Sequence, residues 1–343
     1  MGTPLDVLWI DTLKDERRPV EKVDAGKTRV FSNGPMHYNL LFRMYFGAAL
    51  QWLRRNRIRN QNAIGINIWS FEWEYLWRYL TEVGDTKLGA GDFTNYDGTV
   101  HDSVMWACMD IIDDLYRLHG SWSTEDRLTR LRLFAECVNA NRCVRGTIYQ
   151  CLHSLPSGMV GTSDFNSMYL AFAFRIIWLR LAPDNLKSMG AFDKHFRMVS
   201  YGDDNVWSVS DVCDFFTMPQ VEKAFKDIFG MTYTMADKKT GMVEYVPKES
   251  LTFLKRNFTY HADIGRHVAS SELRGRLETM YWTRRRVDRL TIESDNLQVV
   301  LKEIAAHGKV VWQEIVPPLM DVIRKSDIPR ATNEGYAHYC AQL

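Results

Sequence analysis

Two adjacent carboxylates, Asp203 and Asp204, lie between short apolar runs at residues 198–199 and 206–207. Apolar and β-branched residues favour strands on both sides, and Gly202 permits a tight turn, so we expect a β-hairpin with both acids at its tip. Two carboxylates held together repel each other unless a cation lies between them. Mg2+ is commonly bound by one or two carboxylates together with substrate phosphates. The pattern therefore predicts a Mg2+ site, although an ordinary solvated Gly-Asp turn explains the same residues.

A second pair of acids, Asp92 and Asp97, follows the expected strand at residues 88–91. An acid at the end of a strand points towards the site above that strand. A spacing of five residues across a turn prevents the two acids from occupying equivalent positions. We therefore expect one acid at a metal and the other at a substrate, whereas loop solvation or helix capping is the simpler alternative.

The loop at residues 155–168 contains two glycines and several hydroxyl side chains, and it runs into an apolar helix that reaches about residue 181. Ser157, Thr162 and Asn166 offer donors and acceptors of a size that suits sugar hydroxyls. Thr162 and Asn166 are one helical turn apart. A helix N-cap at Thr162 or Ser163 explains part of this loop but not the whole run.

Cations alternate with apolar residues on either side of Gly26, in residues 14–31. This alternation predicts a β-ribbon that presents cations to a polyanion such as a triphosphate. The cations concerned are Lys14, Arg18, Lys22, Lys27 and Arg29. Acids are interleaved with them, so a salt-bridged surface hairpin is the alternative.

The elements that must position these residues follow from apolar spacing and from turn residues. We expect strands at 7–10, 144–153 and 251–258, and helices at 37–59, 102–118, 124–138 and 221–229. Ser123 is the expected cap of the helix at 124–138. The aromatic-rich segment 69–77 is expected in the core, and helices follow residue 271, with Pro317 and Pro318 as a break.

Composition narrows the class of protein. The chain has 343 residues, of which 46% are hydrophobic and 25% charged, so it can bury a sizeable core and is neither disordered nor fibrous. The formal net charge of +1 favours no particular partner. The six cysteines form no CxxC pair, which argues against a disulfide framework or a zinc site. We expect no signal peptide and no transmembrane segment.

The order of these segments resembles an RNA-dependent RNA polymerase of the picornavirus-like positive-strand RNA viruses. The basic ribbon at 14–29 resembles motif F of that family, the turn at 92–97 resembles motif A, and the loop at 157–167 resembles motif B. Residues 201–204 (Tyr-Gly-Asp-Asp) match motif C, 236–238 (Ala-Asp-Lys) match motif D, and 253–256 (Phe-Leu-Lys-Arg) match motif E. The resemblance covers roughly residues 7–260.

The resemblance implies an α+β right-hand polymerase fold, with an antiparallel palm sheet flanked by helices, partial fingers and a helical thumb. It places fingers at 1–85, palm at 86–260 with a fingers insertion at about 120–150, and thumb at 261–343. The family carries a long fingers segment before motif F. We therefore expect an N-terminally incomplete polymerase.

The resemblance also implies nucleotidyl transfer from ribonucleoside triphosphates to an RNA 3′-OH with two Mg2+ ions, for which Mn2+ can substitute. The implied metal ligands are Asp92, Asp203 and Asp204. Lys238 is the implied general acid, with Lys239 as the alternative. The implied nucleotide-binding residues are Lys14, Arg18, Lys22, Lys27, Arg29, Asp97, Ser157, Gly158, Thr162 and Asn166. Lys255 and Arg256 are implied to contact the primer strand.

The implied partners are template and primer RNA and other viral replication proteins. The implied setting is the host cytoplasm, at membrane-associated replication complexes, after release from a viral polyprotein. Two other interpretations stay open. A reverse transcriptase also carries a YxDD turn, but Asp97 and Asn166 form a ribose-accepting pair. A non-catalytic RNA-binding fragment is the second alternative.

Overall fold

The structure is a computed structural model that describes residues 7–16, 18–120, 122–152, 154–237, 241–282, 288–325 and 332–343. The described residues form two compact units. Unit 1 comprises Met1–Gly65, Gly91–Asn205 and Cys213–Glu244 as far as they are described. Unit 2 comprises the described residues of Ile66–Ala90, Val206–Val212 and Tyr245–Leu343. The division into fingers, palm and thumb stays a prediction.

The first sheet of unit 1 has the strand order β2-β1-β4-β5. Its strands are β1 (Leu8–Leu13), β2 (Val30–Asn33), β4 (Asn141–Val144) and β5 (Thr147–Gln150). β1 pairs antiparallel with β2 and parallel with β4. The expected single strand at 144–153 is wrong, because Arg145 and Gly146 both have positive φ and reverse the chain between β4 and β5.

The basic segment between β1 and β2 differs from the expected continuous ribbon. It contains the short helix α1 (Val20–Asp24), which begins after Pro19 and has Glu21 in its first turn. The fixed φ of proline and an acid near a helix N-terminus both favour this start. Lys22 therefore lies on a helix and not on a strand.

The second sheet has the order β6-β7-β3-β8. Its strands are β6 (Phe196–Tyr201), β7 (Asp204–Val209), β3 (Leu88–Thr94) and β8 (Thr232–Met235). β6 and β7 form the predicted hairpin around the acidic turn. β3 pairs antiparallel with β8, with Asp92 opposite Thr234. The sheet thus brings the strand that carries Asp92 next to the hairpin that carries Asp203 and Asp204.

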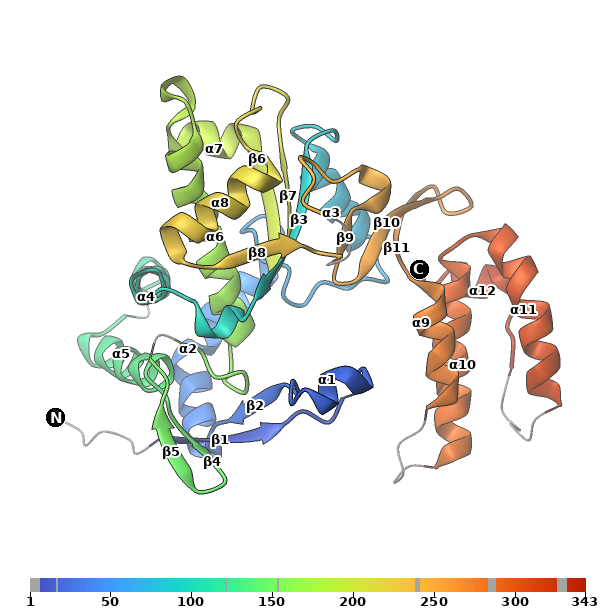
Figure 1. Cartoon of the computed structure of the whole chain (residues 1–343), viewed down its shortest axis with the longest axis horizontal. Helices are drawn as coiled ribbons and strands as arrows, with labels where there is room; N and C mark the ends of the chain where they lie inside the picture. The colour runs from blue at the N-terminus through green and yellow to red at the C-terminus, as the bar shows by residue number, and fades with distance from the viewer. Residues whose placement is uncertain are drawn as a thin grey trace. The chain divides into compact units, whose positions relative to one another are not determined.

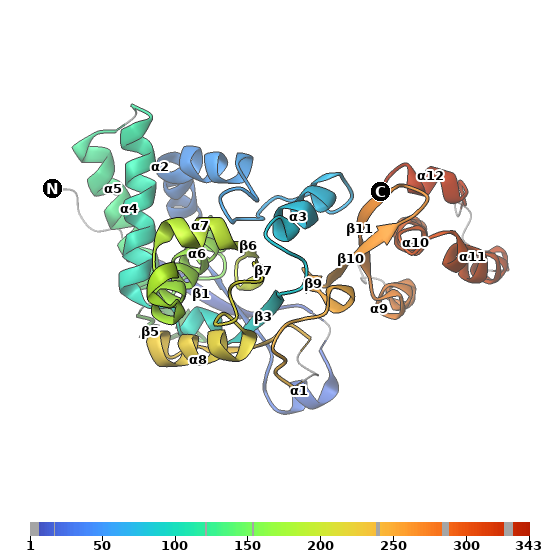
Figure 2. The ribbon, with the colours of Figure 1, turned by 90° about the horizontal axis from the view of Figure 1, so that it is seen from above.

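Helices α6 (Thr162–Leu181) and α8 (Met218–Phe229) contact this sheet and each other, and α7 (Met189–His195) packs on α6 and β6 (Figures 1 and 2). Phe225 of α8 lies against Phe93, Phe174 and Tyr233, with ring centroids 4.9–5.4 Å apart. Buried aromatic side chains of this kind contribute strongly to a core. They fix β3 and β8 against the helices.

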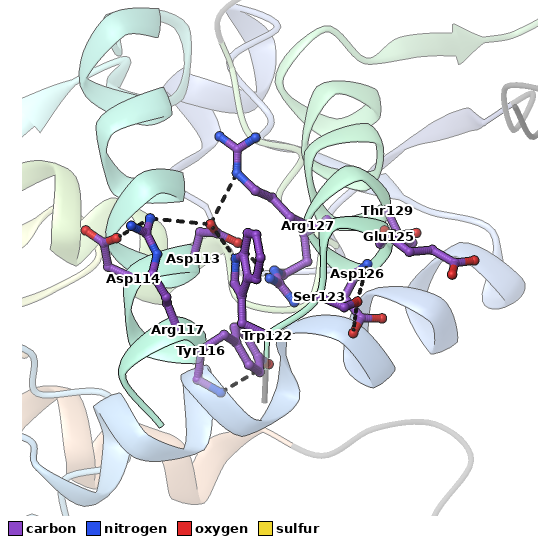
Figure 3. A network of polar contacts seen from close by, with 12 residues as sticks. Asp113, Asp114, Tyr116, Arg117, Trp122, Ser123, Glu125, Asp126, Arg127 and Thr129 are labelled. Carbon is purple, nitrogen blue, oxygen red and sulfur yellow. Dashed lines mark hydrogen bonds and ion pairs between the residues drawn. The ribbon is translucent and has the colours of Figure 1, made fainter. Parts of the chain in front are cut away.

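A buried ion-pair network joins α4 (Asp102–Leu118) to α5 (Thr124–Val138), beside α2 (Met36–Arg55) (Figure 3). Asp113 accepts hydrogen bonds from Arg130 Nη2 at 2.7 Å and from Trp122 Nε1 at 2.9 Å. Burial alone would raise the pKa of Asp113, but the hydrogen bonds from Arg130 and Trp122 lower it below its ordinary value. The network fixes the helix that leads directly into β4.

Unit 2 contains α3 (Glu72–Thr81) and the sheet β11-β10-β9, formed by β9 (Thr252–Phe253), β10 (Arg256–His261) and β11 (Arg266–Ser271). Its C-terminal helices are α9 (Leu273–Leu277), α10 (Arg289–Ala305), α11 (Lys309–Arg324) and α12 (Tyr336–Cys340). Trp73 is fully buried and stacks on Phe253 and Phe258, which confirms the expected core role at this position.

The proline pair in unit 2 does not end a helix. Pro317 and Pro318 lie inside α11, so the predicted break is wrong. Val316, Met320 and Ile323 on the same helix are buried in the core of α10, α11 and α12. This packing holds the helix despite the missing backbone donors. Among the described residues, no helix combines the length and the apolar character that crossing a membrane requires.

Candidate active site

The acidic turn is held by the backbone of Gly202 and by helix α6. Gly202 has φ +67°, and its N–H donates a hydrogen bond to Ser167 Oγ at 2.9 Å. Ser167 Oγ in turn donates to the Ser200 carbonyl at 3.3 Å. Asp203 is exposed at the tip, and Asp204 is half-buried at the start of β7. The turn therefore presents an accessible carboxylate on a backbone that α6 fixes in place.

Asp92 lies on β3, the strand between β7 and β8. Its side chain is half-buried, and its Oδ1 accepts a hydrogen bond from the N–H of Phe93 at 2.9 Å. Thr234 Oγ1 of β8 donates to the Asp92 carbonyl at 3.2 Å. The main chain around Asp92 is thus fixed by β8, and its side chain alternates with the buried Phe93.

Asp97 lies in the short 3-10 helix Tyr96–Gly98, directly after β3. The buried Tyr96 donates a hydrogen bond from its hydroxyl to the Asn166 carbonyl at 3.0 Å. This bond links the turn after β3 to the second turn of α6. It places Asp97 and Asn166, two of the residues predicted to recognise a sugar, on segments that are directly joined.

The charges of this region act on one another. The pKa of Asp97 is raised, chiefly because surrounding protein atoms displace water from its carboxyl group, which is still exposed on one side. The nearby Asp203 carboxylate raises it further. Arg142 and Lys14 oppose this rise. Arg29 also has a raised pKa, chiefly through its hydrogen bond with Glu16 and partly through Asp203. Lys14 and Arg29 next to the ends of β1 and β2, Arg142 on β4, and the carboxylates of Asp97 and Asp203 therefore act on one another electrostatically.

The loop before α6 is attached to β2. Ser157 Oγ accepts a hydrogen bond from the N–H of Ser32 at 3.1 Å, and the N–H of Gly158 donates to the Ser32 carbonyl at 2.9 Å. A Cβ atom at Gly158 would lie 2.3 Å from that carbonyl oxygen, so the close approach requires glycine. Thr162 Oγ1 donates to the carbonyls of Pro156 and Met159. The hydroxyls of this loop thus hold its own shape.

The cations of the basic segment are partly paired. Arg29 donates to both carboxylate oxygens of Glu16, and the Arg29 Nε to Glu16 Oε1 distance is 2.8 Å. Arg18 Nε lies 3.4 Å from Glu16 Oε1, and Arg18 Nη2 donates to the Lys27 carbonyl. The salt-bridged alternative is therefore correct for Arg29 and Arg18. A role of this segment in holding a triphosphate stays a prediction.

We expect Glu16 to titrate unusually low. The hydrogen bond from Arg29 is the main cause that lowers the pKa of Glu16 from 4.5 to about 2. Because the folded pKa is depressed, the pair stabilises the basic segment above about pH 4.5 and loses this effect as the pH falls through about 2. Carbon-13 NMR of the Glu16 carboxyl group measures the midpoint. Arg29→Gln should raise it towards 4.5, whereas Arg43→Gln on the exposed face of α2 should leave it unchanged. A Glu16 midpoint near 4.5 in the unchanged chain would contradict this pairing.

The predicted primer contact at Arg256 does not fit its surroundings. Arg256 is 5% exposed. Its guanidinium donates to both carboxylate oxygens of the buried Glu303 and stacks on the Trp69 ring at 4.7 Å. Its donors therefore serve an internal ion pair. Lys255, in contrast, is exposed on the turn between β9 and β10, where Leu254 and Lys255 both have positive φ. The expected continuous strand at 251–258 is wrong at this turn.

Replacement of Arg256 should therefore affect folding more than RNA binding. Arg256→Ala leaves the Glu303 charge buried and is expected to lower the free energy of unfolding by about 3–5 kcal/mol. Lys255→Ala should change it by less than about 0.5 kcal/mol, because the side chain is exposed. Urea unfolding measures the first effect, and RNA binding at several salt concentrations measures any lost phosphate contact. Unchanged stability together with lost RNA affinity in Arg256→Ala would restore the primer contact.

The sequence interpretation assigned no role to several contributors to this region: Asn205, Tyr233, Arg142 and Glu16 as the partner of Arg29. Asn205 is fully buried and bonds to Tyr233 Oη, to the Gly91 carbonyl and to the Asp203 carbonyl. No spacing rule signals such contacts between distant segments. Lys238 and Lys239, the candidates for the general acid, lie outside the described residues.

The donor set suits a hard divalent cation. Asp92 and Asp203 supply carboxylate oxygens, the ligands that Mg2+ prefers. Within the described ranges, no group of three or more His, Cys, Asp and Glu residues is arranged to hold a metal ion. Mg2+ is ordinarily held by one or two protein carboxylates together with substrate phosphates and water.

The fold is that of a right-hand polymerase. A solved structure titled "Sicinivirus 3Dpol RNA dependent RNA polymerase" matches with a TM-score of 0.81 and 20% sequence identity, over 98% of this chain and 68% of that chain. A family model described as viral RNA-dependent RNA polymerase matches residues 1–323. The chain belongs to this family.

The similar curated proteins include the replicase polyproteins of Cricket paralysis virus and Acute bee paralysis virus. The chain is 35% identical to that of Cricket paralysis virus over 339 residues, which is 96% of this chain and 19% of the polyprotein. It is 35% identical to that of Acute bee paralysis virus over 351 aligned residues, which is 98% of this chain and 18% of the polyprotein. The chain thus spans less than a fifth of the length of these relatives.

Proposed function

We propose that the chain carries the catalytic centre of an RNA-dependent RNA polymerase of a positive-strand RNA virus. A primer 3′-OH attacks the α-phosphorus of a ribonucleoside triphosphate opposite an RNA template. One P–O bond forms, the bond to the pyrophosphate breaks, and pyrophosphate leaves. Such chemistry depends mainly on positioning and charge neutralisation. The proposal is supported by family membership and, above all, by the sheet that brings Asp92 on β3 beside the β6-β7 turn, which carries Asp203 and Asp204.

Asp92 and Asp203 are the proposed ligands of two Mg2+ ions, with Asp204 assisting. When bound, the ions would activate the attacking oxygen and stabilise the leaving one, and Mn2+ would substitute for them. The residues fit this role because one carboxylate lies on β3 and the other on the neighbouring β6-β7 turn.

The basic segment is the proposed triphosphate site. It consists of Lys14, Arg18, Lys22, Lys27 and Arg29. Glu16 holds the Arg29 guanidinium in one orientation, so that less side-chain entropy is lost when a phosphate binds. The proposed general acid is Lys238 or Lys239, which would protonate the departing pyrophosphate.

Ribose recognition is proposed for Asp97 and Asn166, with Ser157, Gly158 and Thr162 shaping the adjacent loop. A site that hydrogen-bonds a 2′-OH leaves polar groups unpaired when a deoxynucleotide enters. The Tyr96 hydroxyl supports this role because it ties the turn of Asp97 to the carbonyl of Asn166. Lys255 is the proposed contact to primer phosphates.

The biological setting is proposed from the relatives, which are polyproteins. We infer that the chain is released from such a polyprotein and works with other viral replication proteins at membrane-associated complexes in the host cytoplasm.

Primer extension on an RNA template tests the proposed function. The chain, supplied with Mg2+ and four ribonucleotides, should extend an annealed RNA primer to the end of the template. A DNA template with deoxynucleotides should support far less extension. Extension that favours deoxynucleotides would indicate a reverse transcriptase, and RNA binding without extension would indicate a non-catalytic fragment.

A further inference from the structure

A buried polar pair, Asn205 and Tyr233, contacts the segments that carry Asp92 and Asp203. Asn205 follows Asp204 on β7, and Tyr233 lies on β8; both side chains are fully buried. Tyr233 Oη donates to Asn205 Oδ1 at 2.8 Å. Asn205 Nδ2 donates to the Gly91 carbonyl at 3.1 Å and to the Asp203 carbonyl at 3.0 Å.

These bonds fix the orientation of the Asn205 amide. Carbonyl oxygens only accept hydrogen bonds, so the nitrogen must face the two carbonyls and the oxygen must face the tyrosine hydroxyl. Both donor hydrogens and the acceptor are then used. A buried amide with every bond made is rigid, whereas loss of one partner leaves a buried polar atom unpaired.

The two carbonyls that Asn205 holds belong to the candidate metal-binding segments. Gly91 immediately precedes Asp92, and the other carbonyl is that of Asp203 itself. The amide therefore bridges the backbones that carry the two principal carboxylates. Because side chains alternate along a strand, Asp92 points to the opposite face of β3 from the position of Gly91. The bridge thus lies on the buried face, and the Asp92 carboxylate lies on the other.

Tyr233 also fixes β3 through its ring. A Cβ atom at Gly91 would lie 2.0 Å from Tyr233 Cζ, so the ring occupies the space that a side chain would need. The same ring packs against Phe93 and Phe225. Tyr233 therefore holds the residues on both sides of Asp92, and its hydroxyl orients the amide that reaches Asp203.

We propose that Asn205 and Tyr233 are positioning residues that set the separation of the Asp92 and Asp203 carboxylates for divalent metal binding. The inference rests on the proposed function, in which these carboxylates hold the metal. Neither side chain touches the metal or the substrate. Groups that orient metal ligands commonly change metal affinity by about 10–100-fold when they are removed. The bond from Tyr233 also links β8 to this bridge.

Mn2+ binding tests the proposal, with free Mn2+ measured by electron paramagnetic resonance. Tyr233→Phe removes one hydroxyl and keeps the ring, and it should weaken Mn2+ binding about tenfold. Asn205→Ala should weaken it at least as much. The double variant should bind no more weakly than Asn205→Ala alone, because both changes break the same bridge. The Mg2+ concentration for half-maximal primer extension should rise in parallel.

Tyr38→Phe is the matched control. Tyr38 is a fully buried tyrosine of unit 1, and its hydroxyl donates to the Leu133 carbonyl at 2.6 Å. Its loss should cost similar stability in urea unfolding and leave Mn2+ affinity unchanged. The proposal is overturned if Tyr233→Phe binds Mn2+ like the unchanged chain, or if Tyr38→Phe weakens binding equally. If Asn205→Ala does not fold, Tyr233→Phe decides alone. An unchanged chain that neither binds Mn2+ nor extends a primer would instead refute the proposed function, and the inference with it.

Discussion

Asp203→Asn is expected to reduce nucleotide addition by at least about 10³-fold, because metal ions and fixed charges at a phosphoryl-transfer site each supply several kcal/mol of transition-state stabilisation. Asparagine has almost the same shape but no charge. Asp203 is exposed, so the fold should persist and RNA should still bind. Single-nucleotide incorporation under rapid mixing measures the rate, and filter binding measures RNA affinity.

A second readout separates loss of charge from loss of structure. The Asp203 carboxylate helps to raise the pKa of Asp97, so Asp203→Asn should lower that pKa. Asp114→Asn is the matched control, because Asp114 is an exposed acid on α4 that pairs with Arg117. Normal addition by Asp203→Asn, or an equal loss in Asp114→Asn, would refute the assignment of Asp203.

Asp97→Ala and Asn166→Ala are expected to weaken the preference for ribonucleotides over deoxynucleotides by about 10–100-fold. A site built to hydrogen-bond a hydroxyl can reject the analogue that lacks it by up to about 10⁴–10⁵-fold, and each variant removes part of that site. Most of the change should be a slower reaction with ribonucleotides. Competition between UTP and its deoxy analogue on one template measures the ratio of kcat/KM.

Tyr96→Phe tests the hydrogen bond that joins the turn of Asp97 to Asn166. It keeps the ring and removes the bond to the Asn166 carbonyl, so it should reduce discrimination less than either alanine variant. Asp114→Ala should leave the ratio unchanged. The assignment would be refuted if both variants, Asp97→Ala and Asn166→Ala, incorporated ribonucleotides and deoxynucleotides in the same ratio as the unchanged chain.

Much of the fold followed from local signals in the sequence. The helix predicted at 102–118 is α4, with the same bounds. Ser123 was expected to cap the next helix, and its side chain accepts a hydrogen bond from the N–H of Asp126. The hairpin around Gly202 was equally local, since apolar strands and one glycine determine it. Such signals involve residues a few positions apart, so a single sequence contains them.

Turns without glycine were harder to predict. Leu254 and Lys255 form the turn between β9 and β10 with positive φ at both positions, which residues with side chains rarely adopt. The sequence there resembles one strand. Only the packing of β10 against β11 and the buried Arg256 show why the chain reverses at this point.

In the candidate site, too, the sequence predicts some residues and not others. Acids at or just after the ends of strands were recognisable, and these are Asp92, Asp97 and Asp203. The groups that orient them were not, because Asn205 and Tyr233 are 28 residues apart and resemble ordinary strand residues. Glu16 looked like one of several acids in a mixed-charge segment, yet it pairs with Arg29 specifically. Tertiary contacts decide these roles, and no periodicity encodes them.

The most direct test of the central claim is a crystal structure of the chain with an RNA primer-template, a non-hydrolysable ribonucleoside triphosphate and Mn2+, with the ions located by anomalous scattering. We predict an ion coordinated by carboxylate oxygens of both Asp92 and Asp203 and by the triphosphate, at the short distances of about 2.0–2.2 Å that are typical of hard cations. A complex in which the ions bind elsewhere, or in which only one of the two carboxylates reaches an ion, would contradict the shared metal site.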